Sequence, residues 1–263
     1  MRTNLYTHDG IDVKYIYLPP KTTAPLNKLA VVITNPINKD GHVDFLFTLN
    51  QFTNIPRLFI VNDKALNSSL LLIKDKAWLV RDAFIALIEK YRGENDTDAK
   101  DVFIITYCDG CPSGFIISLE KGYNAIMSML LFEKHKLALW KDEDPRIEEF
   151  VIRWGQRSDA EGYLFPSVEA VCAYTKLSPD EVKYLLVEYV RQLPREKLHV
   201  PKLYLHYGKH DVRYIIDGRQ TMEALGAYGI NFEAHVDDEE YDHFDASPFF
   251  IRYLTALLKN LMQ

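Results

Sequence analysis

The sequence has few of the features that would place it outside the ordinary globular proteins. Its 263 residues include three cysteines, Cys108, Cys111 and Cys172, and this odd count does not suit a disulfide framework. No apolar run reaches the roughly 18 residues that a membrane span requires. The first residues also lack the apolar stretch of a secretory signal. We therefore expect a protein of a reducing compartment, the cytoplasm, with no membrane span.

Clustered positive charge is also missing. The formal net charge is −6, and Lys and Arg do not gather in a block. Binding to nucleic acid needs a concentrated basic surface, so we expect no nucleic-acid partner. Cys108 and Cys111 have the C-x-x-C spacing, but the chain has no second cysteine pair, which makes a zinc or redox site the less favoured interpretation. We expect no cofactor.

Short apolar runs alternate with helical patterns along the chain. Continuous apolar runs, typical of strands covered on both faces, lie at 29–34, 58–61, 102–107 and 203–207. Amphipathic helical patterns lie at 76–91, 113–121, 217–228 and 247–261. Residues 11–18 alternate and end at two prolines, which indicates an outer strand. This order predicts an α/β fold with a mostly parallel central sheet flanked by helices.

One segment interrupts that alternation. Residues 136–198 contain many charged residues and do not continue the alternation of strands and helices. A helix is predicted to start at Ser178-Pro179, with serine as the N-cap. We interpret this segment as an inserted helical cap, and residues 1–135 and 199–263 as the core. An insertion at this point would cover the carboxyl ends of the strands, where α/β sheets bind ligands.

The strand predicted at 102–107 runs directly into Cys108, Asp109 and Gly110, and a helical pattern follows. A sharp strand-to-helix turn with a nucleophilic residue at its apex is the nucleophile elbow of acyl-transferring enzymes. The helix N-terminus carries partial positive charge, which favours the thiolate form of a cysteine placed there. The pattern therefore predicts a catalytic thiol at Cys108.

Cys111 and Ser113 are alternative nucleophiles in the same segment. The residue after an elbow nucleophile donates its N–H to the oxyanion, and Pro112, which follows Cys111, has no N–H to donate. Ser113 has Phe115 two positions later, where an elbow needs a small residue. Cys108 meets both requirements, so we prefer it while the other two remain open.

Two further residues complete a catalytic set. Asp211 follows the strand at 203–207, and His243 lies in a polar loop after a strand predicted at 230–236. The order nucleophile, acid, histidine suits a triad in which the histidine moves the proton and the acid orients it. A metal cluster is the less favoured use of these side chains, because the i, i+4 spacing of its first two members does not put them on one face of a strand-to-turn segment. That candidate cluster comprises His206, His210, Asp211, His235 and His243.

The segment from Thr106 to Gly110 resembles the G-x-Ser-x-G elbow of the α/β-hydrolases, with threonine at the first glycine position and cysteine as in dienelactone-hydrolase-like members. Gly208 to Asp211 resembles the G-x-x-D segment that carries the acid of that family, and His243 falls where its base lies. The resemblance implies a Cys108–His243–Asp211 triad. It also implies an oxyanion hole formed by the backbone N–H of Asp109 and that of Asn35 or Ile37.

Such a site implies an acyl hydrolase or acyltransferase that acts on a small-molecule ester, thioester or lactone. The alternative is a non-catalytic binding or assembly protein on a degenerate hydrolase fold, because Thr106, Asp109 and Pro112 are unusual choices for an elbow. The Leu58-to-Asp63 segment, together with the elbow, also resembles hydrolase-like proteins of bacterial capsule and accessory-secretion systems. The sequence predicts no oligomeric state.

Overall fold

The computed structural model describes most of the predicted core. The described residues are 3–22, 25–34, 48–61, 74–107, 110–128, 178–179, 202–211, 214, 218–239, 241 and 247–262. The predicted cap at 136–198 lies outside them except for residues 178–179, so the domain division stays a prediction.

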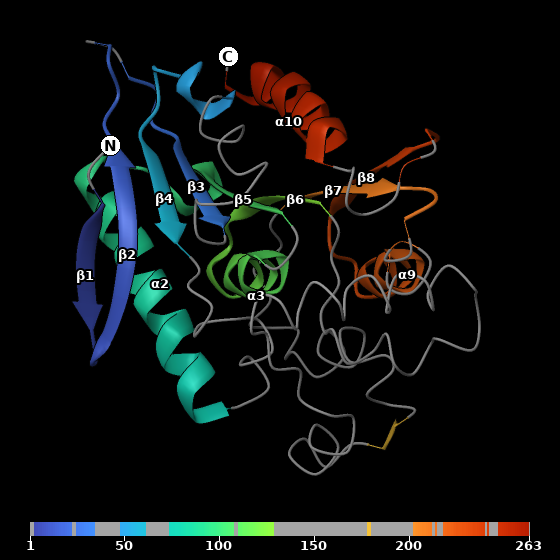
Figure 1. The fold of residues 1–263 in the computed structure, drawn as a ribbon, viewed down its shortest axis with the longest axis horizontal. Helices are drawn as coiled ribbons and strands as arrows, with labels where there is room; N and C mark the ends of the chain where they lie inside the picture. The colour runs from blue at the N-terminus through green and yellow to red at the C-terminus, as the bar shows by residue number, and fades with distance from the viewer. Residues whose placement is uncertain are drawn as a thin grey trace, which may run out of the picture.

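Eight strands form one sheet in the order β1-β2-β4-β3-β5-β6-β7-β8 (Figure 1). β1 pairs antiparallel with β2 and β2 pairs antiparallel with β4, whereas every pairing from β4 to β8 is parallel. The prediction of a mostly parallel sheet is confirmed. The strands are β1 Asn4–His8, β2 Ile11–Leu18, β3 Leu29–Thr34, β4 Arg57–Val61, β5 Val102–Tyr107, β6 Asn124–Ser128, β7 Leu203–Gly208 and β8 Phe232–Asp237.

The edge of the sheet differs from the prediction. β1, not β2, is the outer strand, and the two form a hairpin in which His8 pairs with Ile11. The connecting residues Asp9 and Gly10 have φ values of 48° and 78°, the left-handed conformations that a two-residue type I′ turn requires. The Asp-Gly pair was therefore the available sequence signal for this hairpin.

Helices cover both faces of the sheet (Figure 1). α2 (Lys74–Glu94), α3 (Cys111–Lys121) and α9 (Arg219–Ala227) lie on one face, and α10 (Ser247–Leu261) lies on the other. A short 3₁₀ helix, η3 (Ala99–Asp101), leads into β5. The four predicted helical segments are thus confirmed, with α2 and α3 beginning two residues earlier than expected. None of the helices in the described ranges is both long and apolar enough to cross a bilayer.

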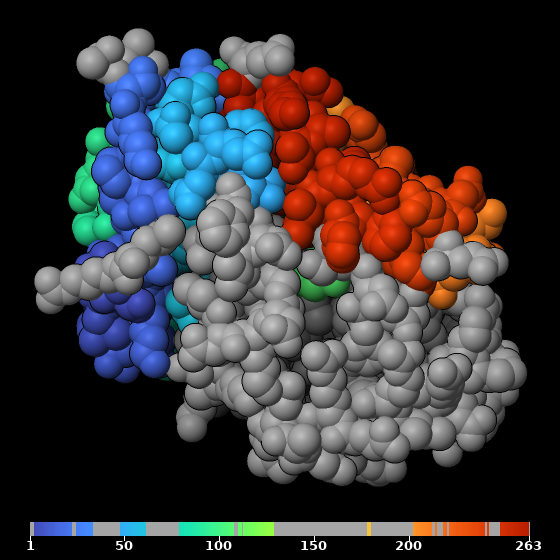
Figure 2. All heavy atoms as spheres, turned by 45° about the horizontal axis from the view of Figure 1, so that its top comes forward, coloured from blue at the N-terminus to red at the C-terminus, as the bar shows by residue number. Residues whose placement is uncertain are grey.

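Each face of the sheet buries its own apolar core. Phe84 of α2, Phe115 of α3 and Leu225 of α9 belong to the core on one side. Phe250 and Leu254 of α10 belong to the core on the other side, with side chains of residues 48–61. Figure 2 shows α10 beside residues 48–61, the last five of which are β4. Burial on both sides explains why the central strands read as continuous apolar runs.

The parallel pairing brings the carboxyl ends of β3 and β5 to β8 to one edge of the sheet. Ile33 pairs with Thr106, Tyr107 pairs with Ser128, and Ser128 pairs with His206. Residues that follow these strands therefore meet at this edge, which is where ligands bind in open α/β sheets.

Candidate active site

The predicted elbow has the expected strand-to-helix context. β5 ends at Tyr107 and α3 begins at Cys111, with Gly110 as its N-cap residue. Cys108 and Asp109, which lie between them, are outside the described residues. The flanking elements are therefore as predicted, while the nucleophile itself stays a prediction.

Gly110 holds this turn against β3. A Cβ atom at Gly110 would lie 2.4 Å from the carbonyl oxygen of Ile33, closer than real Cβ atoms approach a backbone oxygen. Only a glycine fits without a backbone shift. The contact places the start of α3 beside the end of β3, after which Asn35 and Ile37 follow in the sequence.

Thr106 stands where the elbow pattern has glycine, and the structure shows how its larger side chain is accommodated. A Cβ atom on Gly114 of α3 would lie 2.5 Å from Thr106 Cγ2 and 3.1 Å from Ile104 Cγ2. The helix therefore approaches β5 closely because its own residue at the contact is glycine. The G-x-Ser-x-G pattern has a glycine at the position of Thr106 on β5. In this chain the space for close packing comes instead from Gly114 on α3.

Pro112 is likewise compatible with a formed elbow. It lies in the first turn of α3, where a backbone N–H has no intrahelical partner and proline is tolerated. Two of the three unusual residues of the elbow, Thr106 and Pro112, therefore fit the observed backbone. The third, Asp109, lies outside the described residues.

Cys111 and Ser113, the alternative nucleophiles, are buried. The Cys111 side chain is 0 % exposed, and its thiol donates a hydrogen bond to the carbonyl oxygen of Ser128 at 2.9 Å. Its Sγ atom also accepts a hydrogen bond from the Thr106 hydroxyl at 3.4 Å. Ser113 is 7 % exposed. Both side chains are therefore largely withdrawn from solvent, whereas the third candidate, Cys108, lies outside the described residues.

Asp211 lies in a turn directly after β7, as predicted. It is 1 % exposed, its N–H donates to the carbonyl oxygen of Gly208, and its own carbonyl accepts from the N–H of Tyr214. Tyr241 packs on the same turn, since a Cβ atom on Gly208 would lie 2.5 Å from the Tyr241 ring. His243, two residues after Tyr241, lies outside the described residues, as do Asn35 and Ile37.

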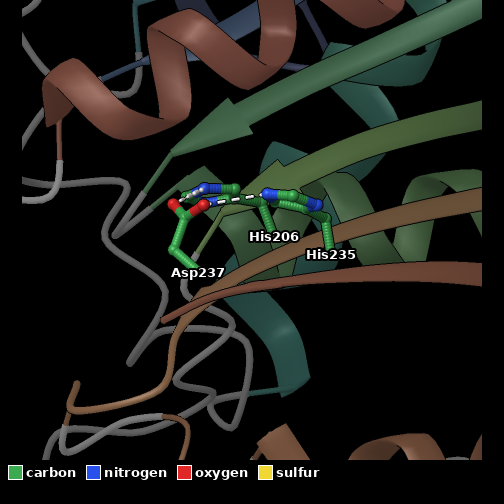
Figure 3. A group of neighbouring side chains, drawn as sticks. All are labelled: His206, His235 and Asp237. Carbon is green, nitrogen blue, oxygen red and sulfur yellow. Dashed lines mark hydrogen bonds and ion pairs between the residues drawn. The ribbon is translucent and has the colours of Figure 1, made fainter. Parts of the chain in front are cut away.

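A polar network that the sequence analysis missed lies beside this turn. His206 pairs in register with Ser128 on one side and with His235 on the other. The Asp237 carboxylate joins the two rings: Oδ2 lies 2.8 Å from His206 Nε2, and Oδ1 lies 2.8 Å from His235 Nε2 (Figure 3). The Tyr241 hydroxyl also donates to Asp237 Oδ2 at 2.9 Å.

Burial and hydrogen bonding set the charges of this network. Burial lowers the pKa of His206, and the hydrogen bond to Asp237 opposes this effect only in part. Burial alone would raise the pKa of Asp237, but hydrogen bonds from Tyr241, His235 and His206 outweigh it and lower that pKa. The lowered pKa of His206 favours its neutral form, and the lowered pKa of Asp237 favours its ionised form. The neutral His206 ring then donates its Nε2–H to the Asp237 carboxylate. Its Nδ1 atom then accepts a hydrogen bond from the Ser128 hydroxyl at 3.0 Å.

Ser128, His206 and Asp237 therefore have the residue types of a serine-hydrolase triad. Ser128 is 0 % exposed, however, and stands at the end of β6 rather than at a strand-to-helix elbow. Its hydroxyl is closed to solvent in this structure and is held by the hydrogen bond to His206. His206, His235 and Asp237 are instead the described residues whose nitrogen and oxygen atoms lie close enough together to hold a metal ion.

Known structures resemble this one across nearly its whole length. A fluorophosphonate-binding serine hydrolase of Staphylococcus aureus has a TM-score of 0.62 and 13 % identity, covering 100 % of this chain and 98 % of its own. Est1E of Butyrivibrio proteoclasticus has a TM-score of 0.61 and 10 % identity, covering 98 % of both chains. The capsule O-acetyltransferase of Neisseria meningitidis serogroup A has a TM-score of 0.58 and 12 % identity, covering 97 % of both.

At the level of sequence, no protein-family model and no curated protein matches the chain. At 10–13 % identity, the structural likeness shows the fold and not the activity. The strand order, the succession of β5 and α3, and the structural neighbours agree, and the chain has the α/β-hydrolase fold.

Proposed function

We propose that this protein is an acyl hydrolase or acyltransferase for small-molecule esters, thioesters or lactones, with Cys108 as nucleophile, His243 as base and Asp211 as acid. The packing of the turn between β5 and α3 is the observation that carries the proposal. Gly110 fits against Ile33, and Gly114 leaves room for Thr106. Both glycines let the turn and the start of α3 pack as closely against β3 and β5 as a nucleophile elbow requires.

The burial of the competing side chains supports Cys108 as the nucleophile. In the proposed first step, the imidazole of His243 takes the thiol proton and the sulfur attacks the acyl carbonyl carbon. The carbonyl oxygen becomes an oxyanion. The imidazolium then gives its proton to the leaving alcohol or thiol as the bond to that group breaks, which leaves a thioester on Cys108.

The second step returns the enzyme to its starting state. Water or an acceptor hydroxyl gives its proton to His243 and attacks the thioester carbonyl, and the thiolate leaves and is reprotonated by the imidazolium. Water as the acceptor gives hydrolysis, and a sugar hydroxyl gives O-acyl transfer. The likeness to a capsule O-acetyltransferase supports a hydroxyl of a cell-surface polysaccharide as one acceptor to test.

The oxyanion of both steps needs two donors. We assign the backbone N–H of Asp109 and that of Asn35 or Ile37 to this role. The contact between Gly110 and Ile33 supports this assignment, because it brings Ile33, two residues before Asn35 in the sequence, next to the start of α3. Loss of one such donor typically costs about 3 kcal/mol in the transition state.

The test compares Cys108→Ala with Cys172→Ala on a panel of acyl esters, thioesters and lactones. We expect Cys108→Ala to abolish turnover and Cys172→Ala to retain it, because only the first removes the attacking atom. Equal turnover in Cys108→Ala and the wild type would show that Cys108 is not the nucleophile. No turnover in any form, with or without a sugar acceptor, would favour the binding protein on a degenerate fold.

A further inference from the structure

We propose that His206, His235 and Asp237 form a binding site for a divalent transition-metal ion of the zinc class. The site would use Nε2 of each imidazole and one or both carboxylate oxygens. These ligand atoms all lie within 4.8 Å of one another. This site is separate from the proposed acyl chemistry, and its existence does not depend on that proposal.

The ligands stand on the rigid part of the fold. His206 and His235 occupy paired positions on β7 and β8, and their rings stack with a centroid separation of 5.8 Å and an interplanar angle of 18°. Asp237 is two residues beyond His235 on the same strand, so its side chain projects from the same face of the sheet. Figure 3 shows both rings directed at its carboxylate. The sheet therefore holds all three ligands near their binding positions.

The outer partners of the ligands suit a metal site. Ligating histidines usually donate their other ring N–H to an oxygen atom, which fixes the tautomer. Ser128 Oγ lies 3.0 Å from Nδ1 of His206 and would turn from donor to acceptor once Nε2 binds the metal. The Tyr241 hydroxyl donates to Asp237 Oδ2 and orients the carboxylate.

The ring protons of His206 and His235 can be accommodated when a metal binds. Without a metal, the two Nε2–H groups donate to Asp237. A metal on Nε2 requires that each proton move to Nδ1, where Ser128 accepts one and solvent accepts the other beside half-exposed His235. Both ring protons therefore keep an acceptor when Nε2 binds the metal.

The ligand atoms determine which ions the site can bind, and the exposure of the side chains determines how an ion enters. Two imidazole nitrogens and one carboxylate suit Zn²⁺, Co²⁺, Ni²⁺ or Fe²⁺, whereas Ca²⁺ and Mg²⁺ prefer oxygen ligands. The side chains of His206, Asp237 and His235 are 0 %, 16 % and 50 % exposed, so the cluster runs from the interior to solvent. An ion can enter from the His235 side, and water can complete its coordination.

The experiment measures metal binding by the full chain prepared without a histidine tag. Zn²⁺ binding is followed by calorimetry, and Co²⁺ binding by its visible absorption. We expect one ion per chain, with affinity reduced roughly tenfold or more in His235→Ala and in Asp237→Asn. His8→Ala, on the distant edge strand β1, is the matched control and should bind as the wild type does.

Nitrogen chemical shifts of the histidine rings give a second readout on the wild type. Zn²⁺ should move the proton of His206 from Nε2 to Nδ1. The proposal is wrong if no stoichiometric ion binds, if both site variants bind as tightly as His8→Ala, or if the His206 tautomer does not change on binding. Circular dichroism checks that each variant is folded.

Discussion

Gly110 lies so close to β3 that a Cβ atom at this position would be 2.4 Å from the carbonyl oxygen of Ile33. This contact joins the turn after β5 to the end of β3, and both segments carry residues of the proposed site. A backbone oxygen cannot rotate away as the end of a side chain can. Any larger residue at position 110 must therefore shift the turn.

We expect Gly110→Ala to lower the free energy of unfolding by about 1–3 kcal/mol, the usual effect of overpacking. Urea unfolding measures this change. Gly226→Ala is the matched control, because Gly226 lies in α9 with no atom within 4 Å of an added Cβ. Alanine is the better helix former, so that variant should gain about 0.5–1 kcal/mol. Equal effects at the two positions would contradict the close contact.

Thr106 and Gly114 should be energetically coupled. Gly114→Ala places a Cβ 2.5 Å from Thr106 Cγ2 and should destabilise the protein. In a Thr106→Ala background the same change should cost less stability, because alanine has no Cγ2 atom. We expect a double-mutant cycle to give a favourable coupling of about 0.5–3 kcal/mol. Strict additivity in urea unfolding would show that the helix does not need glycine to accommodate the threonine.

Tyr241→Phe tests how the loop after β8 is held. It removes the hydrogen bond to Asp237 Oδ2 and keeps the ring, which stacks on Phe249 at a centroid distance of 3.9 Å. We expect a loss of about 1.5–3 kcal/mol in stability, as for hydrogen bonds to charged groups. If the loop positions His243, kcat should also fall while KM changes little. An unchanged kcat in the folded variant would restrict Tyr241 to a structural role.

Glu89 should make stability depend on pH in the acid range. Burial alone would raise the pKa of Glu89, but hydrogen bonds from Arg92 and Tyr123 outweigh it and lower the pKa below its usual value. The stabilisation is therefore present above the unfolded-state pKa, about 4.3, and is lost as the pH falls through the lower folded-state pKa. The stability advantage over Glu89→Gln should disappear in that window.

Thermal unfolding between about pH 3 and pH 7 measures the effect of Glu89. Glu94→Gln is the control, since the Glu94 side chain is 52 % exposed and its ion pair with Lys90 spans 3.7 Å. Its difference from the wild type should vary less with pH. A difference for Glu89→Gln that stays constant down to the lowest pH would contradict the account.

Local patterns were enough to predict the elements around the elbow. The apolar run at 102–107 and the helix that ends before Gly122 were read correctly, because strand burial and helix periodicity are properties of neighbouring residues. Gly122 has a φ of 70°, as expected of a C-cap glycine. The position of Asp211 after β7 followed from the same kind of local signal.

The network around Asp237 could not be predicted in this way. It depends on the parallel register that places Ser128, His206 and His235 side by side, and these residues come from strands far apart in the sequence. Two of the five residues weighed as metal ligands, His206 and His235, are brought together. Their common partner, Asp237, was not among the five, because the predicted strand ended at residue 236 and Asp237 was assigned to the polar loop that follows.

Trapping the acyl-enzyme tests the central claim most directly. The wild-type protein is mixed with an acyl thioester or activated ester, quenched in acid within one turnover, and mapped by tandem mass spectrometry. We predict one acyl group on the Cys108 peptide, released by hydroxylamine, with Cys172 unmodified and buried Cys111 unmodified. An acyl group on any other residue, or undiminished turnover by Cys108→Ala, would contradict the account.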